Sequence, residues 1–349
     1  MNETIAPSFV FQIDWSRKLG SPLYAEILSI ALEDLQRDGP VAAVVRDFEG
    51  DAVPGAMPLR MMGGLHRLVL RGQAPRLAGH YPTTGGTPDG QTLAEDVLST
   101  VDANVGYLRE ALQVPPQTNE IGRSVALFAG LMMALGGESR PVKLLEIGSS
   151  AGLNLMLDNF SYETEPWSWA GTEGAPLLRP DWRGGGPAVP ESIDVLSRQG
   201  CDTNPIDVTV EAERLRLVSF VWADQVDRFD RINKAIDLVD PGSFQLEEAD
   251  AAVWLRDRLA EPVPDGTLTV VQHSVLWQYL SADTQHDIDA TFDRVGAEVT
   301  NGQPLARVAF EASSDENHEG HVLTVQRWPG GERRILGYGQ PHGNWFIWV

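Results

Sequence analysis

The 349-residue sequence predicts an α/β protein with two regions. Up to about residue 140, apolar residues recur at helical spacing between Gly and Pro breaks, and no convincing pair of strands is found. From Val142 onward, short apolar runs alternate with helical patterns, which is typical of a mostly parallel sheet with crossover helices. We therefore expect a helical region at residues 1–140 and a sheet domain at residues 141–349.

Four helices are predicted in the first region. Ser21-Pro22 is a helix start and Gly39-Pro40 a helix stop, with one apolar face between them. A second helix is expected at residues 59–71, and a third keeps helical spacing from Leu93 to Leu112. The fourth follows "QTNE" and runs through "SVALFAGLMMAL" to Gly136.

The second region contains the predicted strands. Parallel strands are expected at residues 142–147, before "GCDTNP", at 243–248 and at 267–274. After a helical stretch at residues 283–299, three further runs at 305–313, 321–328 and 334–349 predict an antiparallel C-terminal edge. An insertion at about residues 161–190 is rich in Gly, Pro and Trp, which indicates a surface loop or, less simply, a lid.

Composition excludes several classes of function. The formal charge of −22 repels phosphate backbones and anionic membrane surfaces, so neither nucleic acid nor a membrane is an expected partner. Cys201 is the only cysteine, which excludes an intrachain disulfide and a thiolate zinc cluster. The chain start does not have the pattern of a signal peptide, and the longest apolar run is too short to span a bilayer. A cytoplasmic location is therefore expected, and the oligomeric state is left open.

One stretch, "LLEIGSSAGLNL", is compatible with two chemistries. Glu146, at the end of a predicted strand, and the small-residue turn after it suit a loop on which a cofactor lies closely. The same turn fits the G-x-S-x-G nucleophile elbow of serine hydrolases, with Ser150 as the nucleophile. That elbow normally follows several strands of its sheet, whereas only helices are predicted here before it, so the hydrolase is the alternative. The cofactor reading assigns contacts to Glu146, Gly148, Ser149, Ser150, Gly152 and Asn154.

The order of these segments resembles the motifs of class I S-adenosylmethionine-dependent methyltransferases, which have a Rossmann-like fold. Ser150 replaces the middle glycine of their first motif. The resemblance implies S-adenosylmethionine as cofactor, with Glu146 binding the methionine ammonium. It further implies that Asp202 binds the ribose, that Asp250 approaches the adenine, and that His273 and Ser274 face the substrate. The methyl acceptor, a small molecule or a protein, is not identifiable.

Other polar residues are weaker candidates. His273 is a possible general base because the ordinary pKa of histidine lies near neutrality. Asn119, Glu120 and Arg123 are candidate substrate-binding residues, although helix capping explains part of "QTNE". "DENHEGH" at residues 315–321 is interpreted as a solvated turn, and no metal is expected. A non-catalytic ligand-binding protein of the same fold is a further alternative.

Nearly the whole chain also resembles a bacterial family known as domain-of-unknown-function family 2332. The matching segments are "HRLVLRGQAPRLAGHYP", "QTNEIGRS", "LLEIGSSAGLNL", "GCDTNPIDVT", "FVWADQ", "VVQHSVLWQYL" and "HGNW". This resemblance implies a methyltransferase-like core behind a helical N-terminal region, without an assigned activity.

Overall fold

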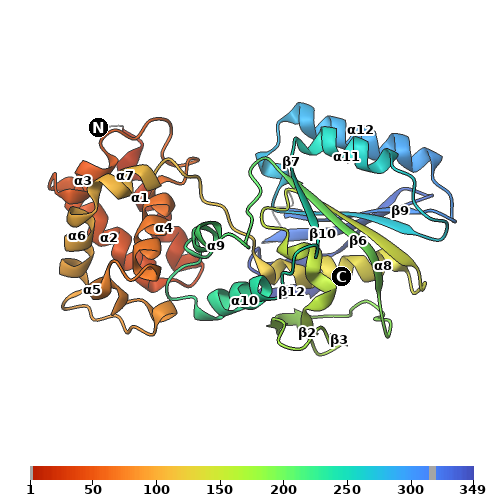
Figure 1. Ribbon diagram of the computed structural model, residues 1–349, viewed down its shortest axis with the longest axis horizontal. Coiled ribbons are helices and arrows are strands. Elements are labelled where there is room, and N and C mark those ends of the chain that lie inside the picture. The colour runs from red at the N-terminus through yellow and green to blue at the C-terminus, as the bar shows by residue number, and fades with distance from the viewer. Residues whose placement is uncertain (1–2, 314–319) are drawn as a thin grey trace. The chain divides into compact units, whose positions relative to one another are not determined.

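A computed structural model describes residues 3–313 and 320–349, which form two compact units (Figure 1). The first unit comprises residues 1–118 and 209–230, and the second comprises residues 119–208 and 231–349. The predicted boundary at residue 140 therefore differs from the structure. The fourth predicted helix belongs to the second unit, and a later segment of the chain returns to the first unit.

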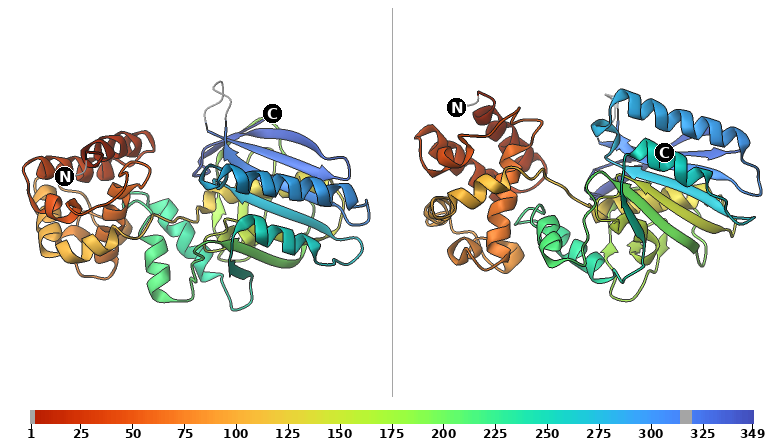
Figure 2. Two further views of the ribbon diagram at one scale, coloured as in Figure 1. Left: turned by 90° about the horizontal axis from the view of Figure 1, so that it is seen from above. Right: turned by 45° about the horizontal axis from the view of Figure 1, so that its top comes forward.

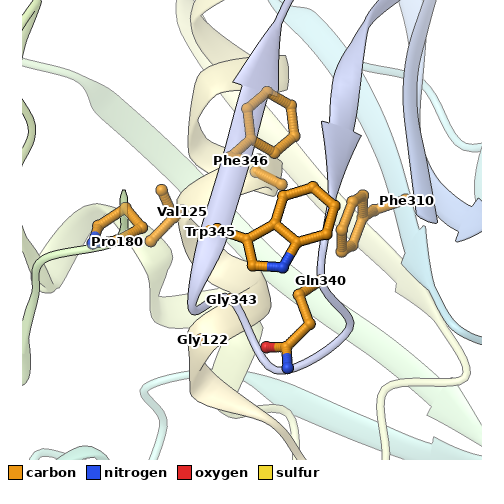
Figure 3. A pocket seen from close by; sticks show the side chains of 9 residues that line it. Gly122, Val125, Pro180, Phe310, Gln340, Gly343, Trp345 and Phe346 are labelled. Carbon is orange, nitrogen blue, oxygen red and sulfur yellow. The ribbon is translucent and has the colours of Figure 1, made fainter. Parts of the chain in front are cut away.

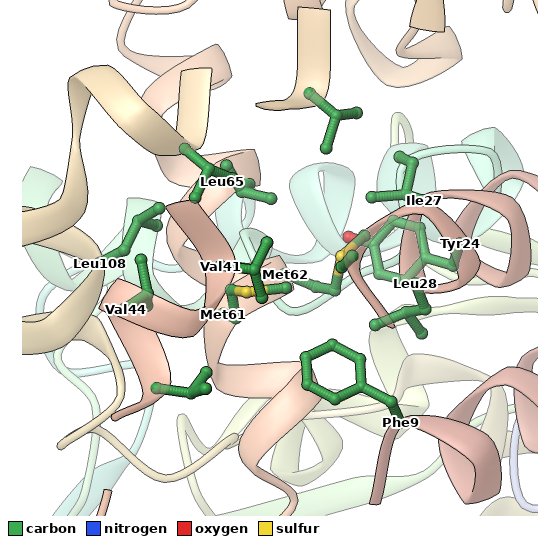
Figure 4. Packing of buried hydrophobic residues seen from close by; sticks show 14 of the residues in the cluster. Phe9, Tyr24, Ile27, Leu28, Val41, Val44, Met61, Met62, Leu65 and Leu108 are labelled. Atoms are coloured by element: carbon green, nitrogen blue, oxygen red, sulfur yellow. The ribbon is translucent and has the colours of Figure 1, made fainter. Parts of the chain in front are cut away.

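The first unit is helical, as predicted. Its elements are α1 (Ile5–Lys18), α2 (Pro22–Gln36), α3 (Pro40–Val45), α4 (Met57–Leu70), α5 (Pro75–Ala78), η1 (Pro82–Thr84), α6 (Leu93–Ala103), α7 (Val105–Ala111), α9 (Glu211–Val218) and the first residues of α10 (Val226–Asp237). The long helix predicted from Leu93 is divided at Asn104 into α6 and α7. Figure 4 shows the apolar core of this unit, in which Phe9, Tyr24 and Met61 are fully or almost fully buried.

The second unit is built on a nine-stranded sheet. Its order is β5-β12-β11-β10-β9-β8-β1-β6-β7, from strands β1 (Pro141–Ile147), β5 (Asp181–Arg183), β6 (Asp194–Asp202), β7 (Gln245–Glu248), β8 (Leu268–Ser274), β9 (Leu305–Ala312), β10 (His321–Trp328), β11 (Glu332–Gly339) and β12 (Trp345–Trp348). Strands β7, β6, β1, β8 and β9 are parallel neighbours, and β9 to β12 are antiparallel. The predicted α/β class and the antiparallel C-terminal edge are confirmed. Strand β9 joins the two parts of the sheet, because it pairs in parallel with β8 and antiparallel with β10.

Helices cover both faces of this sheet, which explains why every residue of β8 is buried. Helices α11 (Ala251–Ala260) and α12 (Ala282–Glu298) lie side by side, as Figure 2 shows, and pack with Leu145, Ile147 and Val271 on one face. Helix α8 (Ser124–Leu135) packs on the opposite face. There Gly130 lies so close to Val308 that a Cβ atom would come within 2.4 Å of its side chain.

The insertion at residues 161–190 is structured, not a loop. It contains a small sheet of β2 (Ser161–Glu163), β3 (Ser168–Trp169) and β4 (Leu177–Leu178), and it supplies edge strand β5. Trp167 and Trp182 are buried, and Trp182 stacks on Phe346 of β12. These aromatic side chains attach the insertion to the sheet. The insertion is therefore rich in tryptophan because these side chains pack in its core.

The remaining elements are short connections. They are η2 (Ile121–Arg123), η3 (Leu153–Asn159) and η4 (Trp277–Tyr279). The 3₁₀ segment η3 follows the glycine turn after β1. Within the described residues, every helix is too short or too polar to cross a membrane.

Candidate functional site

The turn after β1 has an unusual backbone. Gly148, Ser150 and Gly152 all have left-handed conformations, with φ of 69°, 54° and 72°. Glycine adopts such angles without steric cost, whereas Ser150 is held there by its surroundings. Its amide donates to Asp202 Oδ2 at 2.9 Å, and the amide of Ser149 donates to the Cys201 carbonyl oxygen at 3.0 Å. Strand β6 therefore fixes the turn from the side.

The two glycines also fit tightly into the protein itself. A Cβ atom on Gly148 would lie 2.6 Å from a methyl carbon of Leu276, and one on Gly152 would lie 2.7 Å from the ring of Phe244. Their small size is thus required by conformation and by internal packing. In the direction in which a side chain would project, the chain's own residues fill the space.

Glu146 is the most perturbed acid of the site. It lies near the carboxyl end of β1, is 2% exposed, and its Oε2 atom is buried with no hydrogen-bond partner. Burial raises the pKa of Glu146 to about 8, although a hydrogen bond from Gln272 and the charge of Arg123 favour the ionised form. A buried carboxyl group with an open oxygen is ready to accept a hydrogen bond from a ligand.

Two neighbouring amide side chains also have open acceptors. Gln272, the register partner of Glu146 on β8, donates its Nε2 to the Asn154 carbonyl oxygen at 3.0 Å. The Nδ2 of Asn154 in turn donates to the Glu120 carbonyl oxygen at 3.5 Å. Carbonyl oxygens only accept, so both amide orientations are fixed. The atoms left without partners are Gln272 Oε1 and Asn154 Oδ1, which are both acceptors.

Glu146, Gln272 and Asn154 form a buried polar cluster, and the predicted residues of "QTNE" lie beside it. Asn119 Oδ1 accepts from the Leu153 amide at 2.8 Å, and Glu120 Oε1 accepts from the Gly122 amide at 2.9 Å. Arg123 donates to the carbonyl oxygens of Pro341 and Ser274, at 3.0 and 3.4 Å. Asn119 and Glu120 thus hold η2 and η3 in place. The charge of Arg123 reaches Glu146.

Sequence reasoning missed Gln272 and Arg231. Gln272 could have been found as a polar residue inside the buried run of β8. Arg231 approaches Glu120 Oε1 from α10, with its Nη2 at 3.8 Å. It lies more than 100 residues beyond "QTNE", and no local pattern marks it.

His273 does not join the cluster, although the sequence placed it there. In β8, Gln272 and His273 point to opposite faces, and His273 lies with Arg307 and Glu311 on the face covered by α12. Its Nδ1 is 2.6 Å from Glu311 Oε1, and its Nε2 accepts from Arg307 Nε at 3.1 Å. Since Arg307 can only donate, Nδ1 carries the proton. Burial lowers the pKa of His273, and both ring nitrogens are already occupied.

His321 is a different case. Through its pairing with Ala312 it lies on the α8 face, as Glu146 does, and its two ring nitrogens are buried without hydrogen-bond partners. Burial lowers the pKa of His321 to about 4, and the charge of Arg123 contributes, so the imidazole is neutral at pH 7. The other residues of "DENHEGH", at 315–319, lie outside the described residues.

The end of β8 is strained beside the cluster. Val275 has a φ of 53°, which is rare for a β-branched residue, and it follows Ser274, whose carbonyl oxygen accepts from Arg123. Such strain is concentrated at functional sites in proteins. Ser274 is therefore placed at the edge of the cluster, while its neighbour His273 is not.

The two acids assigned to the nucleoside have structural partners. Asp202 is half-buried, and its two oxygens accept from the Ser150 and Asn204 amides, both at 2.9 Å. The Oδ1 atom of Asp250 caps α11 by accepting from the amides of Ala252 and Val253. Asp202 borders the glycine turn, whereas the placement of Asp250 is accounted for by its cap.

A small apolar pocket lies on the same face of the sheet. It is lined by Gly122, Val125, Ala126, Pro180, Phe310, Gln340, Gly343, Trp345 and Phe346. Figure 3 shows the side chains of Phe310, Gln340, Trp345 and Phe346 among those that line the pocket. The ring of Phe310 is 5.6 Å from that of His321, so the pocket adjoins this histidine.

Among the described residues, no three His, Cys, Asp or Glu side chains gather in a way that could hold a metal ion. The Oγ atom of Ser150 is buried and has no hydrogen-bond partner among the described residues, so none of their histidines is positioned to activate it as a nucleophile.

Comparison with known proteins adds the family. No curated protein matches the chain. A solved structure entitled "DhpI-SAM-HEP complex" is 14% identical over 60% of this chain and 69% of that chain, with a TM-score of 0.21, which supports no conclusion about fold or ligand. The sequence profile described as "Uncharacterized protein conserved in bacteria (DUF2332)" matches residues 7–348, and the chain belongs to that family.

Proposed function

We propose that the chain binds S-adenosylmethionine and is a methyltransferase-like protein. The observation that carries this proposal is the set of three buried, unpartnered acceptor oxygens on Glu146, Gln272 and Asn154. An ammonium group has three N–H donors and a positive charge. Its donors match the three acceptor oxygens in number, and its charge matches the carboxylate that Glu146 forms when it ionises. The amino-acid end of S-adenosylmethionine carries such a group.

The fit of the nucleoside end is less complete. A carboxylate offers about four acceptor positions, and two of those on Asp202 are used by main-chain amides, which leaves two for ribose hydroxyls. Gly148 and Gly152 contribute the shape of the turn, and Ser150 offers its open hydroxyl. The adenine role of Asp250 stays a prediction.

When bound, the cofactor would supply an electrophilic methyl group. The residues of the cluster would bind and orient it, and positioning of this kind supplies much of the rate in group transfer. His321 could take a proton from an acceptor, because its ring nitrogens have no hydrogen-bond partners and it lies on the same face of the sheet as Glu146. His273 would instead support the end of β8 through Glu311, which accepts from the Leu276 and Trp277 amides.

The test is calorimetric titration of the full chain with S-adenosylmethionine and S-adenosylhomocysteine. We expect binding of both, and a loss of roughly 10- to 100-fold in affinity in Glu146→Gln, because a charged hydrogen bond contributes about 1.5–3 kcal/mol. Glu298→Gln, at the exposed end of α12, is the matched control. No binding of either compound by the folded wild-type chain would sink the proposal.

The serine hydrolase is the second candidate, because the left-handed backbone of Ser150 is the conformation of a nucleophile elbow. It predicts that a fluorophosphonate probe labels the wild-type chain and not Ser150→Ala. The unpartnered Oγ leads us to expect no labelling of either protein. A separate assay tests whether the protein is a non-catalytic ligand-binding protein. Methylation of any acceptor that depends on S-adenosylmethionine would exclude that alternative.

A further inference from the structure

We propose that Arg231 binds the carboxylate of a zwitterionic ligand, so that the cluster recognises a complete α-amino acid group. Arg231 has no other assigned role. The proposal deepens the proposed function and rests on it for the identity of the natural ligand, but its test does not require S-adenosylmethionine.

The guanidinium of Arg231 has a donor, Nε, that makes no hydrogen bond within the described residues. Its side chain is 21% exposed, and its Nε is buried without a hydrogen-bond partner. The nearby acid, Glu120, is 3.8 Å from Nη2, which is too far for a hydrogen bond, and the same Glu120 oxygen accepts from the Gly122 amide. Leaving the buried Nε donor unpaired costs about 1–3 kcal/mol, and a carboxylate would satisfy it.

The open donors and the open acceptors belong to one connected cluster. Arg231 lies beside Glu120, whose carbonyl oxygen accepts from Asn154, and the Asn154 carbonyl oxygen accepts from Gln272. Gln272 is the register partner of Glu146. One end of this chain of contacts therefore offers N–H donors, and the other offers three acceptor oxygens.

This arrangement selects against ligands that carry only one of the two charges. An amine alone would leave the Arg231 donors unpaired, and a carboxylic acid alone would leave the oxygens of Glu146, Gln272 and Asn154 unpaired. A zwitterion satisfies both sets and adds no net charge to the buried site, which limits the cost of desolvation.

The test uses three small probes on the full-length chain, with binding measured by saturation-transfer NMR. The probes are L-methionine, methylthiopropylamine, which lacks the carboxylate, and methylthiobutyrate, which lacks the ammonium. We expect L-methionine to bind roughly tenfold or more tightly than either analogue. Equal binding of L-methionine and methylthiopropylamine, or no binding of L-methionine, would overturn the proposal without any variant.

A pair of variants assigns the effect to the residue. Arg231→Met should weaken L-methionine binding about tenfold or more and leave methylthiopropylamine unchanged. Lys234→Met, at an exposed position of the same helix, should change neither. Unchanged L-methionine affinity in folded Arg231→Met contradicts the role of Arg231.

The two proposals fail separately. If L-methionine binds in an Arg231-dependent manner and S-adenosylmethionine does not bind, the amino-acid site stands and the proposed function is wrong. If S-adenosylmethionine binds equally to wild type and Arg231→Met, the proposed function stands and this inference is wrong.

Discussion

At the residue scale, Glu146 destabilises the protein that contains it. Its folded-state pKa of about 8 lies above the ordinary value of 4.5. The unfolded chain therefore ionises first as the pH rises, and the folded state loses stability relative to it between these two values. A residue that is retained at such a cost fits a binding role better than a structural one.

We predict that Glu146→Gln stabilises the protein in a pH-dependent way. At pH 5 the variant should be more stable by less than about 1 kcal/mol, because the carboxyl group is protonated in the folded state and, with a pKa of 4.5, already mostly ionised in the unfolded state. Above pH 8 the variant should be more stable by roughly 3–5 kcal/mol, since the glutamine has no proton to lose. Urea unfolding followed by tryptophan fluorescence from pH 5 to pH 9 measures this difference.

The decisive quantity in that experiment is how steeply the stability difference between Glu146→Gln and the wild type changes with pH. A stability difference that stays constant from pH 5 to pH 9 would show that Glu146 is not buried in a perturbed state. Glu298→Gln, at an exposed position, should follow the wild type throughout.

At the element scale, the sequence predicted what local chemistry determines. Helix α2 begins at Pro22 after Ser21, and β1 and β8 are short runs with apolar centres, so their existence and type follow from nearby residues. The face on which a strand residue lies depends on register, which is set by distant partners. For that reason Glu146 lies on the same face as Gln272, whereas His273, one residue further along β8, lies on the other face.

The helix α4 offers a test of how tightly the first unit is packed. Gly63 lies inside this helix, and a Cβ atom there would be 2.6 Å from the ring of Phe220. We predict that Gly63→Ala destabilises the protein by roughly 1–3 kcal/mol, because the clash outweighs the better helix propensity of alanine. Thermal unfolding with far-UV circular dichroism measures the change.

Gly106 in α7 is the matched control for this prediction. It is exposed, and no atom lies within 4 Å of the position a Cβ would take. Gly106→Ala should therefore stabilise by about 0.5–1 kcal/mol. Destabilisation of equal size at both positions would contradict the packing argument.

At the scale of the whole molecule, the chain completes its first unit only after passing through part of the second. Trp222 and Ala223 belong to the core of the first unit, and Trp222 stacks on Tyr24. No local pattern in the sequence predicts this return, because the residues of "FVWADQ" do not indicate that they pack against the helices of the first unit. The predicted boundary at residue 140 failed for this reason.

The contacts of Asp224 with the start of α2 allow the contribution of the returning segment, residues 209–230, to be measured. Its Oδ2 accepts from the Leu23 amide at 3.0 Å, and its Oδ1 accepts from the hydroxyl of Ser21, so it satisfies the start of α2 from 201 residues away. We predict that Asp224→Ala destabilises the first unit by roughly 2–3 kcal/mol, through loss of the cap and an unpaired buried hydroxyl. Hydrogen exchange should show faster exchange of the Leu23 amide. Asp227→Ala, at an exposed position, should change stability by less than about 0.5 kcal/mol. If both variants leave Leu23 protected, α2 does not depend on the returning segment.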